Sequence, residues 1–202
     1  MRIQNLLRLN IILVFFLLYL GNSIFSQNLQ FYKEEMTFEI KDHYFYVSGF
    51  YYFCNNENNV VSKTLFYPFP NEIDYGHVDS VVAINLKQNS ENLIMNVSPK
   101  GGFFKVYLEA FGTAKYKVAY RQKINKNKVE YILITTQDWN KPFECASYKL
   151  IVPSNIMITS ESYLHDSISR KNELVIYYWD RINFMPNKNM IFEFSKNDNN
   201  KK

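Results

Sequence analysis

The sequence has little glycine, and two familiar enzyme signatures are missing from it. Only six of the 202 residues are glycine. No glycine-rich loop that could cradle a phosphate group is present. The sequence also lacks a nucleophile elbow of the Gly-x-Ser-x-Gly kind. The usual signs of a phosphate-binding enzyme and of an α/β-hydrolase are therefore absent.

Histidine is also scarce, with three residues in the whole chain. A zinc site needs several histidine, cysteine or carboxylate ligands at short spacing. Asp74, His77 and Asp79 form the only group with such spacing. A polar turn around Gly76 explains this group without a metal, so we expect neither a metal nor another cofactor.

No catalytic constellation stands out either. His165, Asp166 and Ser167 contain the residue types of a hydrolytic triad. Adjacent residues of an extended chain point to opposite faces, so these three side chains cannot converge. Paired carboxylates that are distant in sequence remain open. The sequence thus leaves enzymatic activity uncertain and favours a non-catalytic protein.

The N-terminus has the order of regions found in a secretory signal peptide. Arg2 and Arg8 provide a positive start, Ile11–Leu20 is an unbroken apolar run, and Ser26 precedes the expected cleavage. Cleavage after Ser23 and an uncleaved membrane anchor are the alternatives. We expect residues 1–26 to be removed and the rest to be secreted or periplasmic.

Neither charge sign dominates the exported part. The whole chain carries 23 basic and 19 acidic side chains, and two of the basic ones leave with the signal peptide. Nucleic-acid binding depends on neutralising phosphates with a basic surface. Nucleic acid is therefore not an expected partner.

Alternation of apolar and polar residues dominates after residue 27 and indicates half-buried strands. The clearest alternating stretches are 36–41, 104–110, 114–121 and 146–152. We expect an all-β, antiparallel β-sandwich of about ten strands, Ig-like or jelly-roll-like, over residues 27–195. Two lobes divided near Pro99–Gly102 are the alternative. Residues 196–202 are expected to form a polar, disordered tail.

The two cysteines, Cys54 and Cys145, would lie in an oxidising compartment after export. A disulfide between them would stabilise the fold by about 4–5 kcal/mol in the chain-entropy model. Strand phase places such a bond on an outer or edge face. Two separate reduced cysteines are the alternative.

Two surfaces are candidates for binding. The first is a basic hairpin with a turn at Asn125–Asn127, which could attract an anionic polysaccharide, a membrane surface or an envelope protein. Its residues are Lys115, Lys117, Arg121, Lys123, Lys126 and Lys128. The second is an aromatic face that could stack on sugars. Its residues are Tyr44, Tyr46 and Tyr52.

Residues 50–70, FYYFCNNENNVVSKTLFYPFP, run as two strands around an Asn-rich turn and end in a proline-bracketed aromatic motif. This stretch resembles the start of the vault/inter-alpha-trypsin type of extracellular domain. Residues 103–153 are similar to uncharacterised bacterial exported proteins with a comparable hairpin and a W-x-K-P turn. The resemblance implies a β-sandwich in the cell envelope and assigns no catalytic residue.

Together these patterns favour an exported, non-catalytic envelope or secreted protein that acts as a binding or structural module. A carbohydrate-binding module that uses exposed aromatic side chains is one alternative. An exported hydrolase with unidentified carboxylates is the other.

Overall fold

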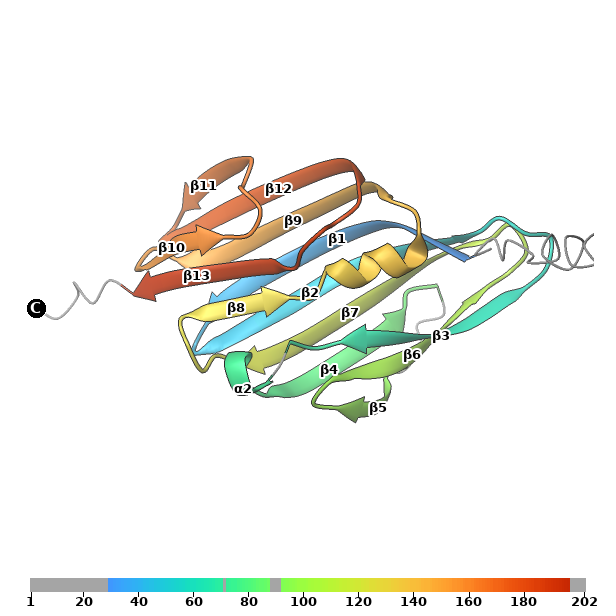
Figure 1. The fold of residues 1–202 in the computed structure, drawn as a ribbon, viewed down its shortest axis with the longest axis horizontal. Coiled ribbons are helices and arrows are strands. Elements are labelled where there is room, and N and C mark those ends of the chain that lie inside the picture. The colour runs from blue at the N-terminus through green and yellow to red at the C-terminus, as the bar shows by residue number, and fades with distance from the viewer. Residues whose placement is uncertain (1–28, 71, 88–91, 197–202) are drawn as a thin grey trace, which may run out of the picture.

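The computed structural model describes residues 29–70, 72–87 and 92–196, which form an all-β protein (Figure 1). The expected signal peptide and residues 197–202 of the expected tail lie outside the described residues. Lys196, also assigned to that tail, is the last residue of a strand. In the described part of the chain, no helix has both the length and the apolar character needed to cross a bilayer.

Thirteen strands make up most of the described residues, more than the number expected from alternation. They are β1 (Leu29–Lys41), β2 (Tyr44–Asn55), β3 (Val61–Pro68), β4 (Val78–Asn85), β5 (Met95–Ser98), β6 (Gly101–Leu108), β7 (Thr113–Lys123), β8 (Lys128–Tyr131), β9 (Phe143–Pro153), β10 (Ile156–Glu161), β11 (Ser167–Lys171), β12 (Leu174–Phe184) and β13 (Met190–Lys196). The helices described are α2 (Glu72–Tyr75) and the 3-10 helix η1 (Ile134–Trp139).

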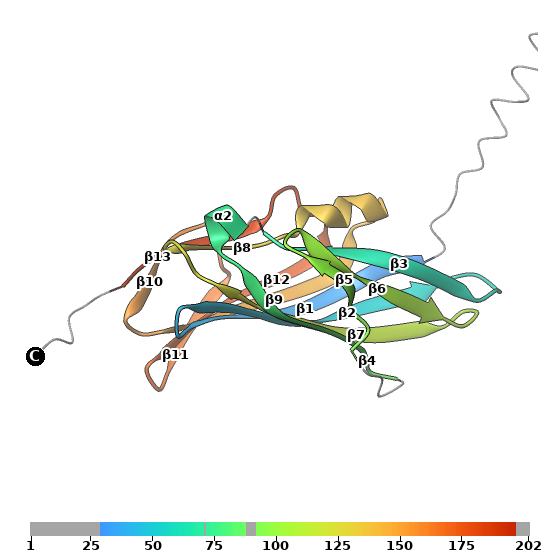
Figure 2. The ribbon, with the colours of Figure 1, turned by 90° about the horizontal axis from the view of Figure 1, so that it is seen from below.

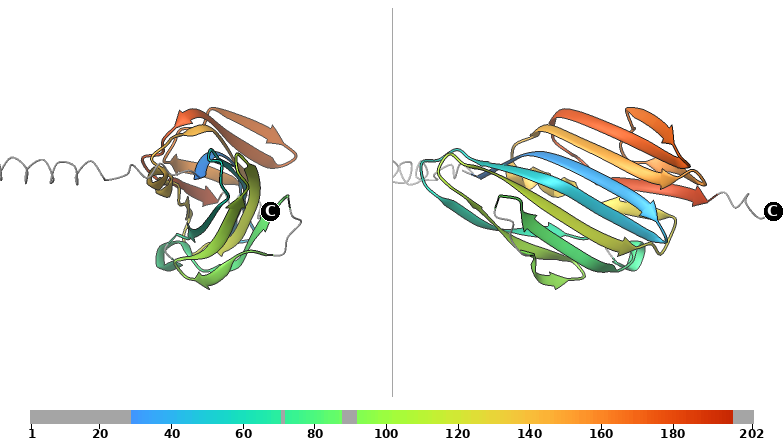
Figure 3. Two further views of the ribbon diagram at one scale, coloured as in Figure 1. Left: turned by 90° about the vertical axis from the view of Figure 1, so that its right-hand side faces the viewer. Right: turned by 180° about the vertical axis from the view of Figure 1, so that it is seen from behind.

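Seven strands form one large curved sheet, in the order β11-β12-β9-β1-β2-β7-β4 (Figure 3). Two sheets of three strands, β10-β13-β8 and β3-β6-β5, lie on one side of it and make the second layer (Figure 2). The expected all-β sandwich is thereby confirmed. The expectation of purely antiparallel pairing needs one correction, because β1 and β9 are parallel neighbours.

The core lies between these layers and follows from the alternation of the central strands. In β1, β2, β7 and β9, one residue in two faces the second layer and is buried. Phe38, Phe45, Val118 and Leu150, one from each strand, are fully buried. Burying a side chain of this size stabilises the fold by about 1.5–3 kcal/mol. The opposite face of the large sheet carries half-buried polar and aromatic side chains.

The expected hairpin after β7 does not form. Strand β7 pairs with β2 and β4, whereas β8 pairs with β13 in the other layer. Residues 124–127 therefore cross from one layer to the other instead of turning back along β7. Local alternation predicts both strands correctly, but it carries no information about which strands are paired.

Candidate functional site

A carboxyl group lies inside the protein at the centre of the large sheet. Glu34 on β1 is 1% exposed. A β-bulge between Phe31 and Lys33 shifts the phase of the strand, so that Phe31 and Glu34 both face inward. Bulges redirect side chains in this way because one extra residue is inserted between ladder pairs.

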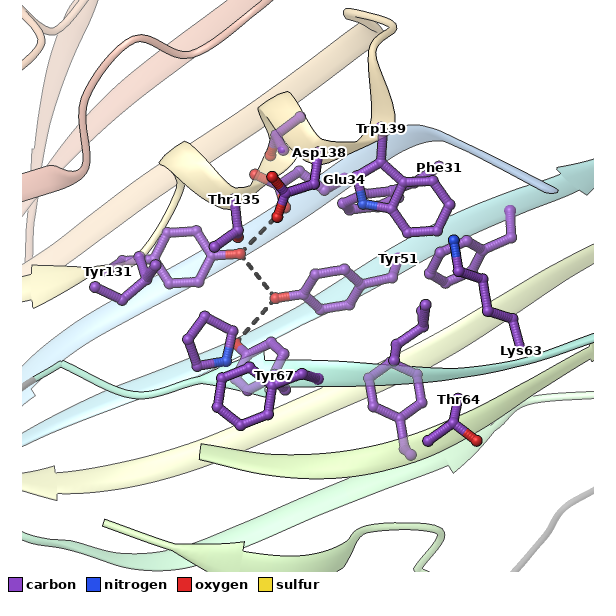
Figure 4. A pocket seen from close by; sticks show the side chains of 17 residues that line it. Phe31, Glu34, Tyr51, Lys63, Thr64, Tyr67, Tyr131, Thr135, Asp138 and Trp139 are labelled. Atoms are coloured by element: carbon purple, nitrogen blue, oxygen red, sulfur yellow. Dashed lines mark hydrogen bonds between the residues drawn. The ribbon is translucent and has the colours of Figure 1, made fainter. Parts of the chain in front are cut away.

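Four tyrosines from four other strands are linked to Glu34 by hydrogen bonds, directly or through one another. Figure 4 shows three of them, Tyr51, Tyr67 and Tyr131. The Tyr148 hydroxyl donates to Glu34 Oε1 at 2.5 Å, and the Tyr131 hydroxyl donates to Glu34 Oε2 at 3.1 Å. The Tyr51 hydroxyl lies 2.8 Å from that of Tyr131 and 3.0 Å from that of Tyr67. Five residues thus form one continuous buried network.

The direction of these hydrogen bonds follows from the charge on Glu34. An ionised carboxylate only accepts hydrogen bonds. Tyr131 must then donate to Glu34, its oxygen accepts from Tyr51, and the oxygen of Tyr51 accepts from Tyr67. A protonated Glu34 can donate to Tyr131 and thereby reverse the chain. The protonation state of Glu34 therefore sets the direction in which the hydroxyl groups of three strands donate their hydrogen bonds.

Burial raises the pKa of Glu34 to about 7, and the hydrogen bonds from Tyr148 and Tyr131 oppose this rise. Burial also keeps the pKa of Tyr51, Tyr67 and Tyr131 well above the usual value for tyrosine, so these groups stay neutral. Titratable groups perturbed by burial near neutral pH cluster at functional sites.

The network ends at a cavity of about 270 Å³. The large sheet provides one wall with Phe31, Glu34, Tyr51 and Phe53. Strand β3 provides a second wall with Lys63 to Pro68, and η1 covers the cavity with Thr135, Thr136, Asp138 and Trp139. Eight of the seventeen lining residues are aromatic, and polar groups occupy a few positions, as in many small-molecule sites.

Trp139 and Lys63 meet at one end of this cavity (Figure 4). The Trp139 ring centroid lies 5.8 Å from those of Phe31 and Phe53. Lys63 Nζ lies 4.9 Å from the Trp139 ring centroid, which is within cation–π distance. Lys63 occupies an inward-facing position of β3, in phase with the buried Tyr67.

Sequence patterns did not predict this site, although one signal for it is present. Glu34 shares the phase of the apolar residues Met36 and Phe38, so alternation places a charged residue on the core face. Buried carboxylates are rare unless they are paired or hydrogen-bonded. Nothing in the sequence indicates which tyrosines would be the partners.

The two surfaces chosen from the sequence lie together on the outer face of the large sheet. Strands β2 and β7 are antiparallel neighbours, and the selected side chains face each other across the pair. The facing pairs are Tyr44 with Lys123, Tyr46 with Arg121 and Tyr52 with Lys115. What looked like two candidate surfaces is therefore one surface, which we call the outer patch and define by Tyr44, Tyr46, Tyr52, Lys115, Lys117, Arg121 and Lys123.

Cations and rings contact each other within the outer patch. Lys115 Nζ lies 4.0 Å from the Phe50 ring centroid and 4.9 Å from that of Tyr52. The Arg121 guanidinium lies 4.5 Å from the Tyr44 ring centroid. It also makes two hydrogen bonds to Asp79, at 2.8 and 3.1 Å, so part of the positive charge is neutralised within the protein.

Lys126 and Lys128 do not belong to the outer patch, contrary to expectation. Lys126 lies in the crossing between layers and forms an ion pair with Asp74, and Lys128 begins β8 and forms an ion pair with Glu193. The expectation was wrong for these two residues because β8 joins the opposite layer.

The expected disulfide is not formed, and both thiols are free in this structure. Cys54 on β2 pairs with Gln30, and Cys145 on β9 pairs with Lys33, so β1 lies between them. Neighbouring strands are about 4.8 Å apart, which places β2 and β9 about 10 Å from each other across β1. A disulfide requires a Cα–Cα distance below about 7 Å.

The histidine groups noted in the sequence have structural partners. Asp79 is bound to Arg121, and among the described residues no group of three or more histidine, cysteine or acidic side chains could hold a metal ion. His165 Nδ1 contacts Glu161 Oε1 at 2.7 Å, while Asp166 accepts from Arg181 at 2.6 Å. His165 and Asp166 thus have different partners, as expected for adjacent residues of an extended segment.

No family model matches the chain, and no curated protein matches it. Among solved structures, the fold is similar to a Legionella pneumophila protein that carries the provisional description of a nutrient-binding protein. The TM-score is 0.69 at 14% identity, over 83% of this chain and 67% of the other. It is also similar to a variant of an M1 zinc metallopeptidase from Deinococcus radiodurans, with a TM-score of 0.50 at 8% identity. That match covers 83% of this chain but 42% of the peptidase, so this chain spans less than half of the peptidase length. Both likenesses establish a shared fold alone.

Proposed function

We propose that this protein is an exported binding module that holds a small ligand in the cavity beside Glu34. The observation that carries the proposal is the cavity of about 270 Å³, walled by aromatic rings and bordered by the hydroxyl network of Tyr51 and Tyr67. Apolar walls with a few fixed polar groups are the usual composition of small-molecule sites. The provisional description of the Legionella protein is in keeping with a binding role.

Hydrogen bonding within the site favours binding over catalysis. A general acid must reach the bond that it protonates, at about 2.6–3.2 Å. Glu34 is 1% exposed, and both of its oxygens already accept hydrogen bonds from tyrosines. A ligand in the cavity would meet Tyr51 and Tyr67 before it reached the carboxyl group.

A hydrolase is the second candidate, because Asp138 lines the same cavity as Glu34. Two carboxylates with different environments are the usual machinery of glycoside hydrolysis. Turnover of chromogenic glycosides that is lost in both Glu34→Gln and Asp138→Asn would favour this reading. An absence of turnover in the wild-type protein would leave the binding module as the better proposal.

The binding role is tested by thermal shift against a broad panel of small metabolites. We expect at least one compound to stabilise the wild-type protein. Thr135→Trp, which fills the cavity from η1, should abolish that shift. Thr159→Trp is the matched control, because Thr159 is an exposed residue on β10. A panel without any binder, or a shift that survives Thr135→Trp, would refute the proposal.

Export is tested separately by expressing the full chain in a bacterium and sequencing the N-terminus of the exported form. The apolar run followed by Ser26 motivates cleavage before Gln27. A full-length product that stays in the membrane would contradict this part of the proposal without affecting the cavity.

A further inference from the structure

Three charged side chains line the cavity, the carboxyl groups of Glu34 and Asp138 and the ammonium group of Lys63. Glu34 is held by tyrosine hydroxyls alone, and Lys63 is seated against the Trp139 ring. Lys63 is the only basic residue among the described residues that line the cavity. Glu34 is buried and Lys63 is half-buried, and a buried charge without a counterion is costly.

The positive end of the cavity combines Lys63 with an aromatic wall. Lys63 Nζ lies over the Trp139 ring, and that ring packs against Phe31 and Phe53. An ammonium group on a flexible stem can donate up to three hydrogen bonds. This end can therefore receive an anionic group beside an apolar one.

The opposite end of the cavity, formed by Tyr51 and Tyr67, can accept hydrogen bonds from a ligand when Glu34 is ionised. The hydroxyl protons of Tyr131, Tyr51 and Tyr67 then all point along the network toward the carboxylate. Spare acceptor positions remain on Tyr51 and Tyr67, which line the cavity. A cationic donor at this point would favour the ionised form of Glu34.

We propose that the cavity binds a free α-amino acid with an apolar side chain. Its carboxylate would lie at Lys63, its ammonium group at Tyr51 and Tyr67, and its side chain against Phe31, Phe53 and Trp139. This inference rests on the proposed function and names the class of ligand.

Charge complementarity selects this class over simpler ones. A monocarboxylate would bring no cation to the Glu34 end, and a monoamine would bring no anion to Lys63. A neutral sugar would satisfy neither charge. The volume of about 270 Å³ lies just below the range of about 300–1,000 Å³ for drug-sized ligands, which suits a single small metabolite.

Calorimetric titration of the purified wild-type protein at pH 8 tests the inference with four probes. L-leucine carries both charges, isoamylamine lacks the carboxylate, isocaproate lacks the amino group, and D-glucose is neutral. We expect L-leucine to bind at least tenfold more tightly than each of the other three. Equal binding of isoamylamine or isocaproate would overturn the inference.

Lys63→Met provides a second test, with Lys105→Met as its matched control. Lys105 is exposed on the neighbouring strand β6, where it pairs with Thr64 of β3. We expect Lys63→Met to reduce L-leucine affinity to that of isoamylamine and to leave isoamylamine affinity unchanged or stronger. Lys105→Met should bind L-leucine like the wild type. If Lys63→Met binds L-leucine like the wild type, Lys63 does not contact the carboxylate and the inference fails.

The remaining outcomes separate the ligand class from the proposed function. If D-glucose or another panel compound binds in the cavity and L-leucine does not, the amino-acid class is wrong and the binding module stands. If no compound of either set binds, both proposals fail. If Lys63→Met does not fold, the four wild-type titrations alone decide the question.

Discussion

Tyr148 stands opposite Met36 in the parallel β1–β9 pair, and its hydroxyl donates to Glu34 Oε1 at 2.5 Å. Tyr148 and Glu34 are 114 positions apart in the sequence. Hydrogen bonds from a hydroxyl to a carboxylate are short and stronger than neutral ones. This hydrogen bond therefore links β9 to β1, its parallel neighbour at the centre of the large sheet.

Removal of the Tyr148 hydroxyl should destabilise the protein in a pH-dependent way. Tyr148→Phe should lower the free energy of unfolding by about 1.5–3 kcal/mol at pH 8, where Glu34 is ionised. The loss should be smaller at pH 5, because a neutral carboxyl forms weaker hydrogen bonds. Urea unfolding at both pH values measures the difference. Tyr178→Phe, on the outer face of β12, is the control. Equal losses at both pH values would contradict the expected role of Tyr148.

Glu34 should make the stability of the protein decrease as the pH rises. Its pKa is about 7 in the folded state and 4.5 when unperturbed, so the folded state holds an extra proton between these values. The stability that this extra proton contributes is fully present below about pH 4.5 and is lost as the pH rises to about 7. Above pH 7 no further stability is lost, and the total loss is about 3 kcal/mol. The difference in unfolding free energy between wild type and Glu34→Gln, measured from pH 4 to pH 8, should follow this curve. A flat difference would show that Glu34 does not titrate in this window.

Binding of L-leucine should weaken below about pH 7. Protonation of Glu34 removes the negative charge that attracts the ammonium group, and Tyr131, Tyr148, Tyr51 and Tyr67 around it stay neutral. The dissociation constant should rise by up to about tenfold per pH unit below this pKa. Titrations from pH 5.5 to pH 8 test this. An affinity that does not change over this range would argue that the ammonium group lies elsewhere.

The outer patch should bind an anionic polysaccharide without contributing much to stability. Reversal of Lys115 and Lys117 to Glu should change the free energy of unfolding by about 1 kcal/mol or less per site. Retention on alginate should fall in this variant, and wild-type retention should fall as salt shortens the Debye length below about 10 Å. Lys100→Glu with Lys105→Glu, exposed lysines of the other layer, is the matched control. Equal retention of both variants would leave the patch as an ordinary solvated face.

Both cysteines should react with an alkylating reagent without prior reduction. Strand β1 separates Cys54 from Cys145, so no bond can form without rearranging the sheet. Burial raises the pKa of the Cys54 thiol, which should slow its reaction at neutral pH. Mass spectrometry of exported protein after alkylation under native and denaturing conditions gives the count of free thiols. A cross-linked Cys54–Cys145 peptide would show that the strand order is wrong.

Local patterns in the sequence predicted much of the strand content and little of the strand pairing. Alternation over residues 114–121 and 146–152 agrees with the burial patterns of β7 and β9. A period-two pattern does not predict contacts between distant segments. The parallel pairing of β1 with β9 and the crossing that begins at Ile124 both depend on such contacts.

The candidate site was likewise predictable from the sequence only in part. The outward phase of Lys115, Lys117 and Arg121 was predictable, because it follows from alternation within one strand. The Glu34 network was not, because Tyr131 and Tyr148 reach the carboxyl from strands that only the tertiary fold brings together. Polar groups assembled from distant segments leave no local spacing that could be recognised.

The position of β1 has a consequence for the way this chain folds. Strand β1 is flanked in the sheet by β2, which follows it at once in the chain, and by β9, which begins at Phe143. One edge of β1 therefore remains without its partner until β9 has been made, and an unpaired edge is a template for aggregation. Long-range pairings of this kind give slow folding, in the range of milliseconds to seconds. Transport across a membrane in an unfolded state would postpone closure of the sheet until β9 arrives on the far side.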